Sequence, residues 1–265
     1  MIRSLYSAAS GMQAQQTNID VISNNLANVN TPGFKGSSAQ FEDLLYDVEK
    51  QPGAILGNGS NTPGSLSVGY GTKLVATNMD MTQGEMVQQS GSQLSLAIQG
   101  NGFFQVQLAD GSGLNAYTRN GSFQVNQSGQ IVTNDGLVLV GAPQVPQGVT
   151  QISVSQDGTF TFQVNGQTQN GGQVQLTQFI NPQGLDNHLG GGLFLQTTAS
   201  GPQLQGKPMT NGLGSIQQGY IENSNVQVVT QMVQMIQAQR AYEVNAKSIQ
   251  AADQMMQQAD NLRQS

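Results

Sequence analysis

The sequence predicts an α+β protein that is mainly β, with an amphipathic helix at each end and a central antiparallel β domain. Three observations support this class. Apolar residues recur every seven positions near both termini. Apolar and polar residues alternate between them, and turn dipeptides containing glycine separate the alternating runs. We expect the terminal helices to pair as an α-helical coiled-coil domain, and the middle to form a β-sandwich or a barrel-like domain.

The N-terminal helix is expected over about residues 3–28. Leu5, Met12, Ile19 and Leu26 recur every seven residues and would form one apolar stripe. A stretch rich in Asn, Pro and Gly follows, which predicts the end of the helix. At a rise of about 1.5 Å per residue, the helix would be roughly 38 Å long.

The C-terminal helix is expected over about residues 225–262. Ser224 with Gln227 fits a capping box at its start. The same seven-residue spacing connects five residues of this helix: Val228, Met235, Tyr242, Ile249 and Met256. On the pattern alone, a helix pair within one chain and packing between copies of the chain explain the two stripes equally well.

Between the helices, alternating runs predict strands at 103–108, 121–125, 151–154 and 172–176. Tight turns are expected at five dipeptides: Asp110-Gly111, Asn120-Gly121, Asp135-Gly136, Asp157-Gly158 and Asn165-Gly166. We therefore expect a helical core domain of residues 1–33 plus 224–265, and a β domain of residues 76–211. A connecting region of residues 34–75 plus 212–223 would join them, with an extended arm at 47–72.

The composition excludes several classes of protein. Charged residues are 9% of the chain, against about 25% in an average soluble domain. The net charge is -6 and the 9 basic residues are scattered, so a nucleic-acid partner is not expected. No apolar run is long enough for membrane insertion. The first residues lack the apolar core of a secretory signal, so we expect no cleaved signal peptide.

No catalytic, cofactor-binding or metal-binding residue is predicted, and we expect that the protein is not an enzyme. Cysteine is absent and His188 is the single histidine, so neither a nucleophilic triad nor the usual transition-metal sites can be assembled. The turn Gly100-Asn101-Gly102 is followed by a predicted strand, whereas a phosphate loop precedes a helix. Glu42 and Asp43 are adjacent, so they cannot face one substrate as a carboxylate pair.

Both ends of the chain resemble the signatures of the bacterial flagellar rod and hook axial protein family. The similar segments are 7–14 and 23–35 at one end and 219–226 and 235–247 at the other. Their most characteristic residues are Asn24, Asn25, Ala27, Asn28, Gly33, Phe34, Gln239, Arg240 and Tyr242. Segments 41–46, 51–54 and 100–106 resemble the members that form the distal rod. The similarity runs almost end to end and is loosest over about 140–215.

The resemblance implies a structural subunit of the flagellar distal rod, with roles in motility and no enzymatic activity. Copies would polymerise into a rigid helical tube whose innermost layer is the paired terminal helices. The tube would cross the periplasm as a drive shaft between proximal rod proteins and hook protein, and would enclose an export channel. Other implied partners are the ring bushings of the peptidoglycan and outer-membrane layers, the rod cap and the flagellar type III export gate.

Particular residues gain expected roles from this resemblance. The pair Phe41 and Leu45 resembles the element that docks subunits at the export gate, and the arm at 47–72 resembles an insertion that keeps the rod straight. Gln13 and Gln16 could line the channel with uncharged side chains. Before assembly the terminal segments should be largely disordered, because their stripes lack partners. The alternatives are a proximal rod or hook subunit of the same family, or a secreted β-rich adhesin.

Overall fold

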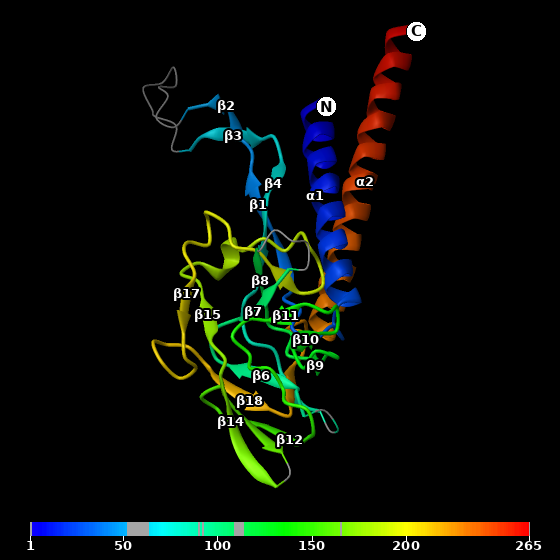
Figure 1. Cartoon of the computed structure of the whole chain (residues 1–265). Helices are drawn as coiled ribbons and strands as arrows, with labels where there is room; N and C mark the ends of the chain where they lie inside the picture. The colour runs from blue at the N-terminus through cyan, green and yellow to red at the C-terminus, as the bar shows by residue number, and fades with distance from the viewer. Residues whose placement is uncertain are drawn as a thin grey trace. The chain divides into compact units, whose positions relative to one another are not determined.

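The computed structural model describes residues 2–51, 64–89, 91, 93–108, 114–164 and 166–264. The expected turn at Asp110-Gly111 and the middle of the expected arm lie outside the described residues. The chain divides into two compact units. The first comprises Met1–Leu26, Ser37–Asn78 and Gln227–Ser265, and the second comprises Ala27–Gly36 and Met79–Val226. The described part is mainly β with one long helix at each end, which confirms the α+β class (Figure 1).

The described residues of the first unit form both long helices and four strands: α1 (Ile2–Ala27), β1 (Ser37–Asp43), β2 (Tyr46–Lys50), β3 (Leu66–Gly69), β4 (Thr72–Met79) and α2 (Val228–Gln264). The helices lie beside each other and run in opposite directions (Figure 1). β1 pairs with β4, and β2 pairs with β3 in antiparallel register. The described flanks of the expected arm are therefore strands, because β2 and β3 hydrogen-bond each other.

α2 begins at Val228, so the capping box expected at Ser224 and Gln227 is wrong. The Ser224 hydroxyl instead accepts the N–H of Val226 at 3.2 Å. The residues before the helix are held by the second unit: the N–H of Asn223 donates to the carbonyl oxygen of Glu85 at 2.8 Å. These contacts keep the segment non-helical until Gln227, whose carbonyl oxygen accepts the first helical hydrogen bond.

Where the structure describes it, the second unit consists of short strands and one 3-10 helix: β5 (Met86–Gln88), β6 (Leu96–Gln99), β7 (Phe104–Gln107), β8 (Asn115–Thr118), β9 (Phe123–Val125), β10 (Ile131–Thr133), β11 (Val138–Leu139), β12 (Val149–Val154), β13 (Thr159–Val164), β14 (Gln167–Gln173), β15 (Leu176–Gln178), η1 (Pro182–Gly184), β16 (Leu193–Phe194), β17 (Leu204–Gly206), β18 (Ser215–Gln218) and β19 (Tyr220–Glu222). One six-stranded sheet has the order β16-β8-β7-β11-β10-β9, and a three-stranded sheet has the order β12-β13-β14. The pairs β15-β17, β18-β6 and β19-β5 complete the unit. The larger sheet has open edges at β16 and β9, so these described strands do not form the barrel that was one of the expectations.

Two of the turn signals are confirmed as hairpins, whereas the hairpin expected at Asn120-Gly121 is wrong, because β8 and β9 on either side of it do not pair with each other. Gly136 joins β10 to β11 with φ 83°, and Gly158 joins β12 to β13 with φ 81°. The strand expected at 172–176 is wrong, because the chain changes sheets there. β14 ends at Gln173, the N–H of Val174 donates to the carbonyl oxygen of Gly158, and β15 begins at Leu176 and pairs with β17.

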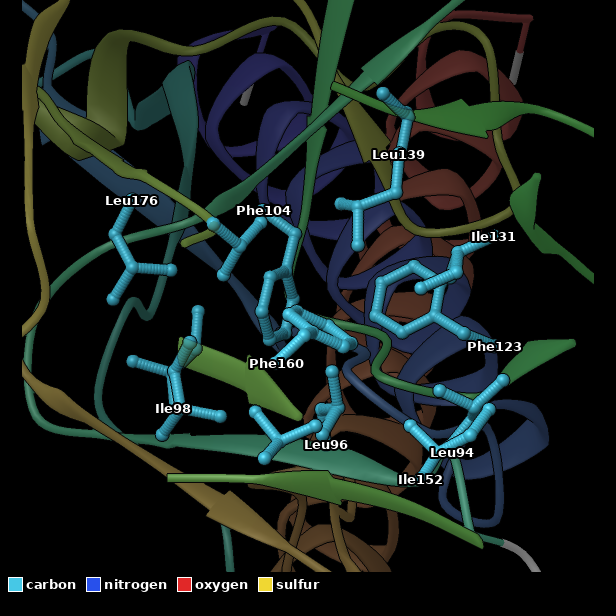
Figure 2. Packing of buried hydrophobic residues seen from close by; sticks show 14 of the residues in the cluster. Leu94, Leu96, Ile98, Phe104, Phe123, Ile131, Leu139, Ile152, Phe160 and Leu176 are labelled. Atoms are coloured by element: carbon cyan, nitrogen blue, oxygen red, sulfur yellow. The ribbon is translucent and has the colours of Figure 1, made fainter. Parts of the chain in front are cut away.

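One hydrophobic core joins the larger sheets of the second unit (Figure 2). Phe104 and Phe123 pack edge to face with ring centroids 5.2 Å apart. Figure 2 shows Phe160 and Ile152 from the three-stranded sheet in the same cluster. Burial of such side chains contributes about 25 cal/mol per Å² of apolar surface. Within the described residues, no helix is both long and apolar enough to cross a bilayer.

Candidate assembly interface

Two contacts define how α1 and α2 lie against each other. A Cβ built on Gly11 would lie 2.8 Å from Asn245 Nδ2, and Asn25 Nδ2 lies 3.4 Å from Gln231 Oε1. The same number of residues, fourteen, separates Gly11 from Asn25 and Gln231 from Asn245. The helices therefore keep one antiparallel register over about 21 Å of their length. Glycine at position 11 lets the Asn245 side chain approach the α1 backbone.

Mostly small side chains are the buried ones along these two helices. They are Ala8, Ala14, Ile22, Asn25, Ala238 and Ala252. The large residues of the predicted stripes are less buried. Leu5, Met12, Ile19, Leu26, Met235, Ile249 and Met256 are half-buried, and Val228 and Tyr242 are exposed. A single chain thus leaves much of its predicted apolar stripe uncovered. Whether these nine residues form the self-assembly interface stays a prediction.

The first turns of α2 expose a further apolar surface. Val229, Met232, Val233 and Ile236 follow the helical spacing i, i+3, i+4 and i+7, and we call them the α2 patch. All four side chains are exposed, and Val229 is 75% accessible to solvent. Contiguous exposed apolar side chains of this kind mark interaction surfaces rather than ordinary solvated faces.

Asn25, one of the predicted motif residues, anchors α1 to the strand that follows it. Its Nδ2 donates to the carbonyl oxygen of Ser37 at 2.7 Å, and its Oδ1 accepts the N–H of Ser37 at 2.9 Å. The amide side chain thus acts as a strand partner for the first residue of β1. Both hydrogen bonds are partly buried, which raises the penalty for losing them.

Other motif residues shape the turn after α1. The hydroxyl of Thr31 donates to Asn28 Oδ1 at 3.2 Å. Gly33 has φ 73°, and a Cβ there would lie 2.6 Å from the backbone nitrogen of Asn120. Glycine is required at this position by both backbone conformation and space. Phe34 is half-buried, whereas Asn24, Ala27, Gln239 and Arg240 are exposed.

A buried charge cluster lies in the second unit, where the chain leaves α1 and where it approaches α2. Glu222 Oε1 accepts hydrogen bonds from Lys35 Nζ at 2.6 Å and from the N–H of Gly84 at 2.9 Å. Glu222 Oε2 accepts one from Arg119 Nη1 at 3.2 Å, and the Glu222 carbonyl oxygen accepts the N–H of Gly33 at 2.8 Å. Glu222, Lys35 and Arg119 are 0%, 3% and 4% exposed. We call these three residues the junction cluster.

Burial dominates the electrostatics of the junction cluster. Loss of solvation lowers the pKa of Lys35, and the nearby Glu222 carboxylate opposes that shift. Burial likewise lowers the pKa of Arg119, again opposed by Glu222. The Arg119 guanidinium also lies over the Phe103 ring, 5.2 Å from its centroid. Two cations therefore share one carboxylate in a site shielded from water.

Sequence reasoning missed the junction cluster, although the sequence contains a signal for it. Each of the three residues is the single charge in a long uncharged stretch. Lys35 stands alone between Asp20 and Glu42, and Glu222 stands alone between Lys207 and Arg240. In a chain with few charges, such isolated ones are candidates for buried partners.

The residues expected to contact the export gate and the channel all lie on exposed surface. Phe41 on β1 is partly exposed, and Leu45 is 85% exposed between β1 and β2. Gln13 and Gln16 are exposed on α1, and Gln16 Nε2 donates to Asp20 Oδ1 at 3.2 Å. Gln13 also lines a groove of about 560 Å³ with Tyr6 and other residues of the first unit. Their expected roles stay predictions.

The one histidine makes a local contact. His188 Nδ1 lies 2.6 Å from Asp186 Oδ2, and both side chains are exposed. The Asp186 pKa is lowered mainly by its hydrogen bond with His188. Across the described residues, no group of three or more His, Cys, Asp or Glu side chains could hold a metal ion.

Family models match three segments of the chain. Residues 5–35 match the model described as "Flagella basal body rod protein". Residues 97–162 match "Flagellar hook protein FlgE/F/G D1 domain", and residues 217–262 match "Flagellar basal body rod FlgEFG protein C-terminal".

Full-length relatives agree with these matches. The flagellar basal-body rod protein FlgG of Buchnera aphidicola subsp. Acyrthosiphon pisum is 46% identical over 99% of this chain and 100% of its own. The FlgG proteins of Borreliella burgdorferi and Bacillus subtilis are 41% and 36% identical, again over 99% of this chain. The hook protein FlgE of Helicobacter pylori is 43% identical, but over only 53% of this chain and 19% of its own length.

The terminal helices, their uncovered apolar surface and the three family matches define a structural subunit of the flagellar rod and hook class. That class is not a class of enzymes. More narrowly, the chain belongs to the flagellar basal-body rod protein FlgG family, and it fits the role of a structural subunit of the distal rod. The resemblance found at both ends of the sequence is thereby confirmed.

Proposed function

We propose that copies of this chain polymerise into a rigid helical tube in which the terminal helices pair as a coiled coil and form the innermost layer. The exposed apolar surface of these helices is the observation that supports this most strongly. The described residues of the chain leave the α2 patch exposed, and the predicted stripe residues are at most half-buried. Neighbouring copies would complete their packing.

We propose that the assembly is open. The α2 patch belongs to one helix of one chain, so a contact between it and a different surface of the next copy is heterologous. Heterologous contacts that do not close into a ring generate helical filaments. At about 25 cal/mol per Å², covering four large apolar side chains in every subunit would contribute several kcal/mol per contact. The terminal helices would then become fully ordered only on assembly.

The partners that we propose for the tube are those that the resemblance to the family implies. The tube would cross the periplasm as a drive shaft from the proximal rod to the hook, turn within the peptidoglycan and outer-membrane rings, and grow beneath a rod cap. Subunits would arrive through the type III export gate, which Phe41 and Leu45 would contact. The arm at 47–72 would keep the tube straight. Gln13 and Gln16 would line the channel, where uncharged amides hold water without binding charged passengers.

The rod assignment is favoured over the hook assignment by coverage. The rod relatives match along their whole length, whereas the matched segment is 19% of the Helicobacter pylori hook protein. A secreted adhesin would instead remain monomeric and bind a ligand to saturation.

Sedimentation and electron microscopy of concentrated protein test the proposal. The wild type should form long tubes. Val233→Asp places a charge in the α2 patch and should abolish the tubes. Circular dichroism should show that the second unit of this variant stays folded. Gln250→Asp adds the same charge to an exposed position four to five turns further along α2 and should still form tubes. Monomers at high wild-type concentration, or equal loss of tubes in both variants, would reject the proposed interface.

A further inference from the structure

The junction cluster joins parts of the chain that are distant in sequence. Lys35 lies eight residues after the end of α1, and Glu222 lies six residues before the start of α2. Arg119 follows β8 directly, and Gly84 lies just before β5. Lys35, Arg119 and Glu222 fall one each in the three family-matched segments. Four stretches of chain therefore meet at one carboxylate.

The charges in this cluster are unequal. Lys35 and Arg119 are both cationic, and among the described residues Glu222 is the carboxylate that forms an ion pair with each of them, while Asp80 also acts electrostatically on Lys35. Removal of either cation leaves one balanced ion pair. Removal of the carboxylate leaves two buried like charges that repel each other. An uncompensated buried charge is strongly destabilising, so we expect loss of the carboxylate to destabilise the unit more than loss of one of the two cations.

Hydrogen bonds to the backbone connect the junction cluster to the segments that follow α1 and precede α2. The Glu222 carbonyl oxygen accepts the N–H of Gly33, and Lys35 Nζ also donates to the carbonyl oxygen of Thr82 at 2.6 Å. Asn225, three residues after Glu222, accepts the N–H of Gly36 at 2.8 Å and donates to the carbonyl oxygen of Asp80 at 2.8 Å. The segment that follows α1 and the segment that precedes α2 are thus bound to each other as well as to the β unit.

We propose that Glu222 is a positioning residue. Its insertion between Lys35 and Arg119 closes the second unit around the segment that follows α1 and the segment that precedes α2. The subunit then becomes competent to polymerise only when both of these segments are in place. Without Glu222, repulsion between the two cations keeps the site open. When Glu222 binds both cations, the segment that follows α1 and the segment that precedes α2 are held against each other. Competence for polymerisation rests on the proposed function, whereas closure of the cluster does not.

A simple packing role makes a different prediction. If the three side chains only filled space, each truncation would loosen the unit, and two truncations would loosen it more than one. The charge account instead predicts that loss of a cation rescues loss of the carboxylate. This reversal of sign distinguishes the two accounts.

Hydrogen exchange on the full-length chain at low concentration measures closure. The reporters are the amides of Gly33, Gly84 and Asn223, which are hydrogen-bonded to Glu222 or beside it. Glu222→Gln should raise their exchange rates by at least about a hundredfold. Lys35→Met and Arg119→Met should raise them by less than about tenfold. The double variant Lys35→Met/Glu222→Gln should exchange more slowly than Glu222→Gln alone.

Glu85→Gln is the matched control, because it removes an exposed carboxylate from the same unit and should leave these rates unchanged. If Glu222→Gln does not fold, a folded double variant supports the proposal, and an unfolded double variant contradicts it. The proposal is also contradicted if Lys35→Met raises the exchange rates of the reporter amides as much as Glu222→Gln does.

Electron microscopy then separates closure from polymerisation. Glu222→Gln should fail to form tubes at concentrations where wild type and Glu85→Gln form them, and the double variant should recover part of the tube mass. If Glu222→Gln forms tubes as well as the wild type does, the proposed role of Glu222 in polymerisation is overturned and the proposed function stays intact. A wild type that forms no tubes would overturn the function, and the exchange rates would still decide closure.

Discussion

Lys35 Nζ and Glu222 Oε1 lie 2.6 Å apart although 187 residues separate them in the sequence, and both side chains are almost completely buried. A hydrogen bond of this length between oppositely charged groups is among the stronger polar contacts in proteins. It ties the segment after α1 to the segment before α2 inside the second unit. Much of the behaviour expected of the chain follows from this contact and from the exposed apolar residues of the two terminal helices.

The stability contributed at Lys35 should depend on pH. Its pKa in the folded chain is lowered from 10.5, chiefly by burial. Between that lowered value and 10.5 the folded chain has released a proton that the unfolded chain still binds, so the free energy of unfolding rises with pH. Glu222, Arg119 and Asp80 all act on this group, and Lys35→Met removes its titration.

Urea unfolding at several pH values between 7.5 and 10.5 checks this expectation. The difference in unfolding free energy, wild type minus Lys35→Met, should increase toward 10.5. Burial raises the pKa of Tyr117, and the hydrogen bond with Asp43 raises that of Tyr46. Both tyrosines are present in the two proteins, so their effect on the difference cancels. A difference that stays flat or falls would contradict the expected effect of Lys35.

Gly33→Ala should destabilise the second unit more than an ordinary glycine substitution. Gly33 has φ 73°, and the new Cβ would lie 2.6 Å from the Asn120 nitrogen, so strain and a backbone clash add. We expect a loss of roughly 2–4 kcal/mol.

Gly136→Ala is the matched control for this substitution. Gly136 has φ 83° with nothing within 4 Å of the new Cβ, so about 1 kcal/mol is expected from backbone conformation alone. Urea midpoints of the two variants measure the contribution of the clash. Equal losses would mean that the close approach of Gly33 to Asn120 is absent in solution.

Disulfide trapping should reveal the register of α1 and α2 in polymerised protein. The chain has no native cysteine, so an engineered pair can be read without background. Gly11→Cys with Asn245→Cys should oxidise within one chain, because these positions face each other. Gly11→Cys with Ala238→Cys is offset by about 10 Å along α2 and should not oxidise. Equal trapping of both pairs would exclude a fixed antiparallel register.

Lysine at Gln13 or Gln16 should slow the export of later subunits if α1 lines the channel. Both side chains are exposed on α1, and an added cation would bind acidic segments of passing chains. Gln13→Ser, which stays uncharged, is the control at the same site. Filament length per unit time in cells gives the measurement. Unaltered growth with either lysine would place these residues away from the channel.

The local patterns of the sequence predicted the elements well, because they depend on neighbours in the chain. The stripe led by Leu5 and Met12 predicted α1, and Asp157-Gly158 predicted the hairpin between β12 and β13. The alternation of apolar and polar residues wrongly predicted a strand over 172–176. Val174 is buried, but it lies in the link between β14 and β15, which belong to different sheets. Alternation shows which side of a strand faces the core, but it does not show where the chain changes partners.

Long-range contacts were harder to predict. The heptad spacing identified large apolar residues, yet the structure buries mainly small ones such as Ala238 and Ala252. Gly11 shows why, since close approach of two helices needs the absence of a side chain. The isolation of Lys35 and Glu222 among uncharged residues marks each as a candidate for burial, but their pairing depends on the fold of the whole second unit and is not visible in the sequence.

A helical reconstruction of the assembled protein by cryo-electron microscopy tests the central claim most directly. We predict a tube in which α1 and α2 form the inner layer and the α2 patch, including Val229 and Val233, is buried against a neighbouring copy. A tube with Val229 and Val233 facing solvent, or protein that stays monomeric at high concentration, would contradict it.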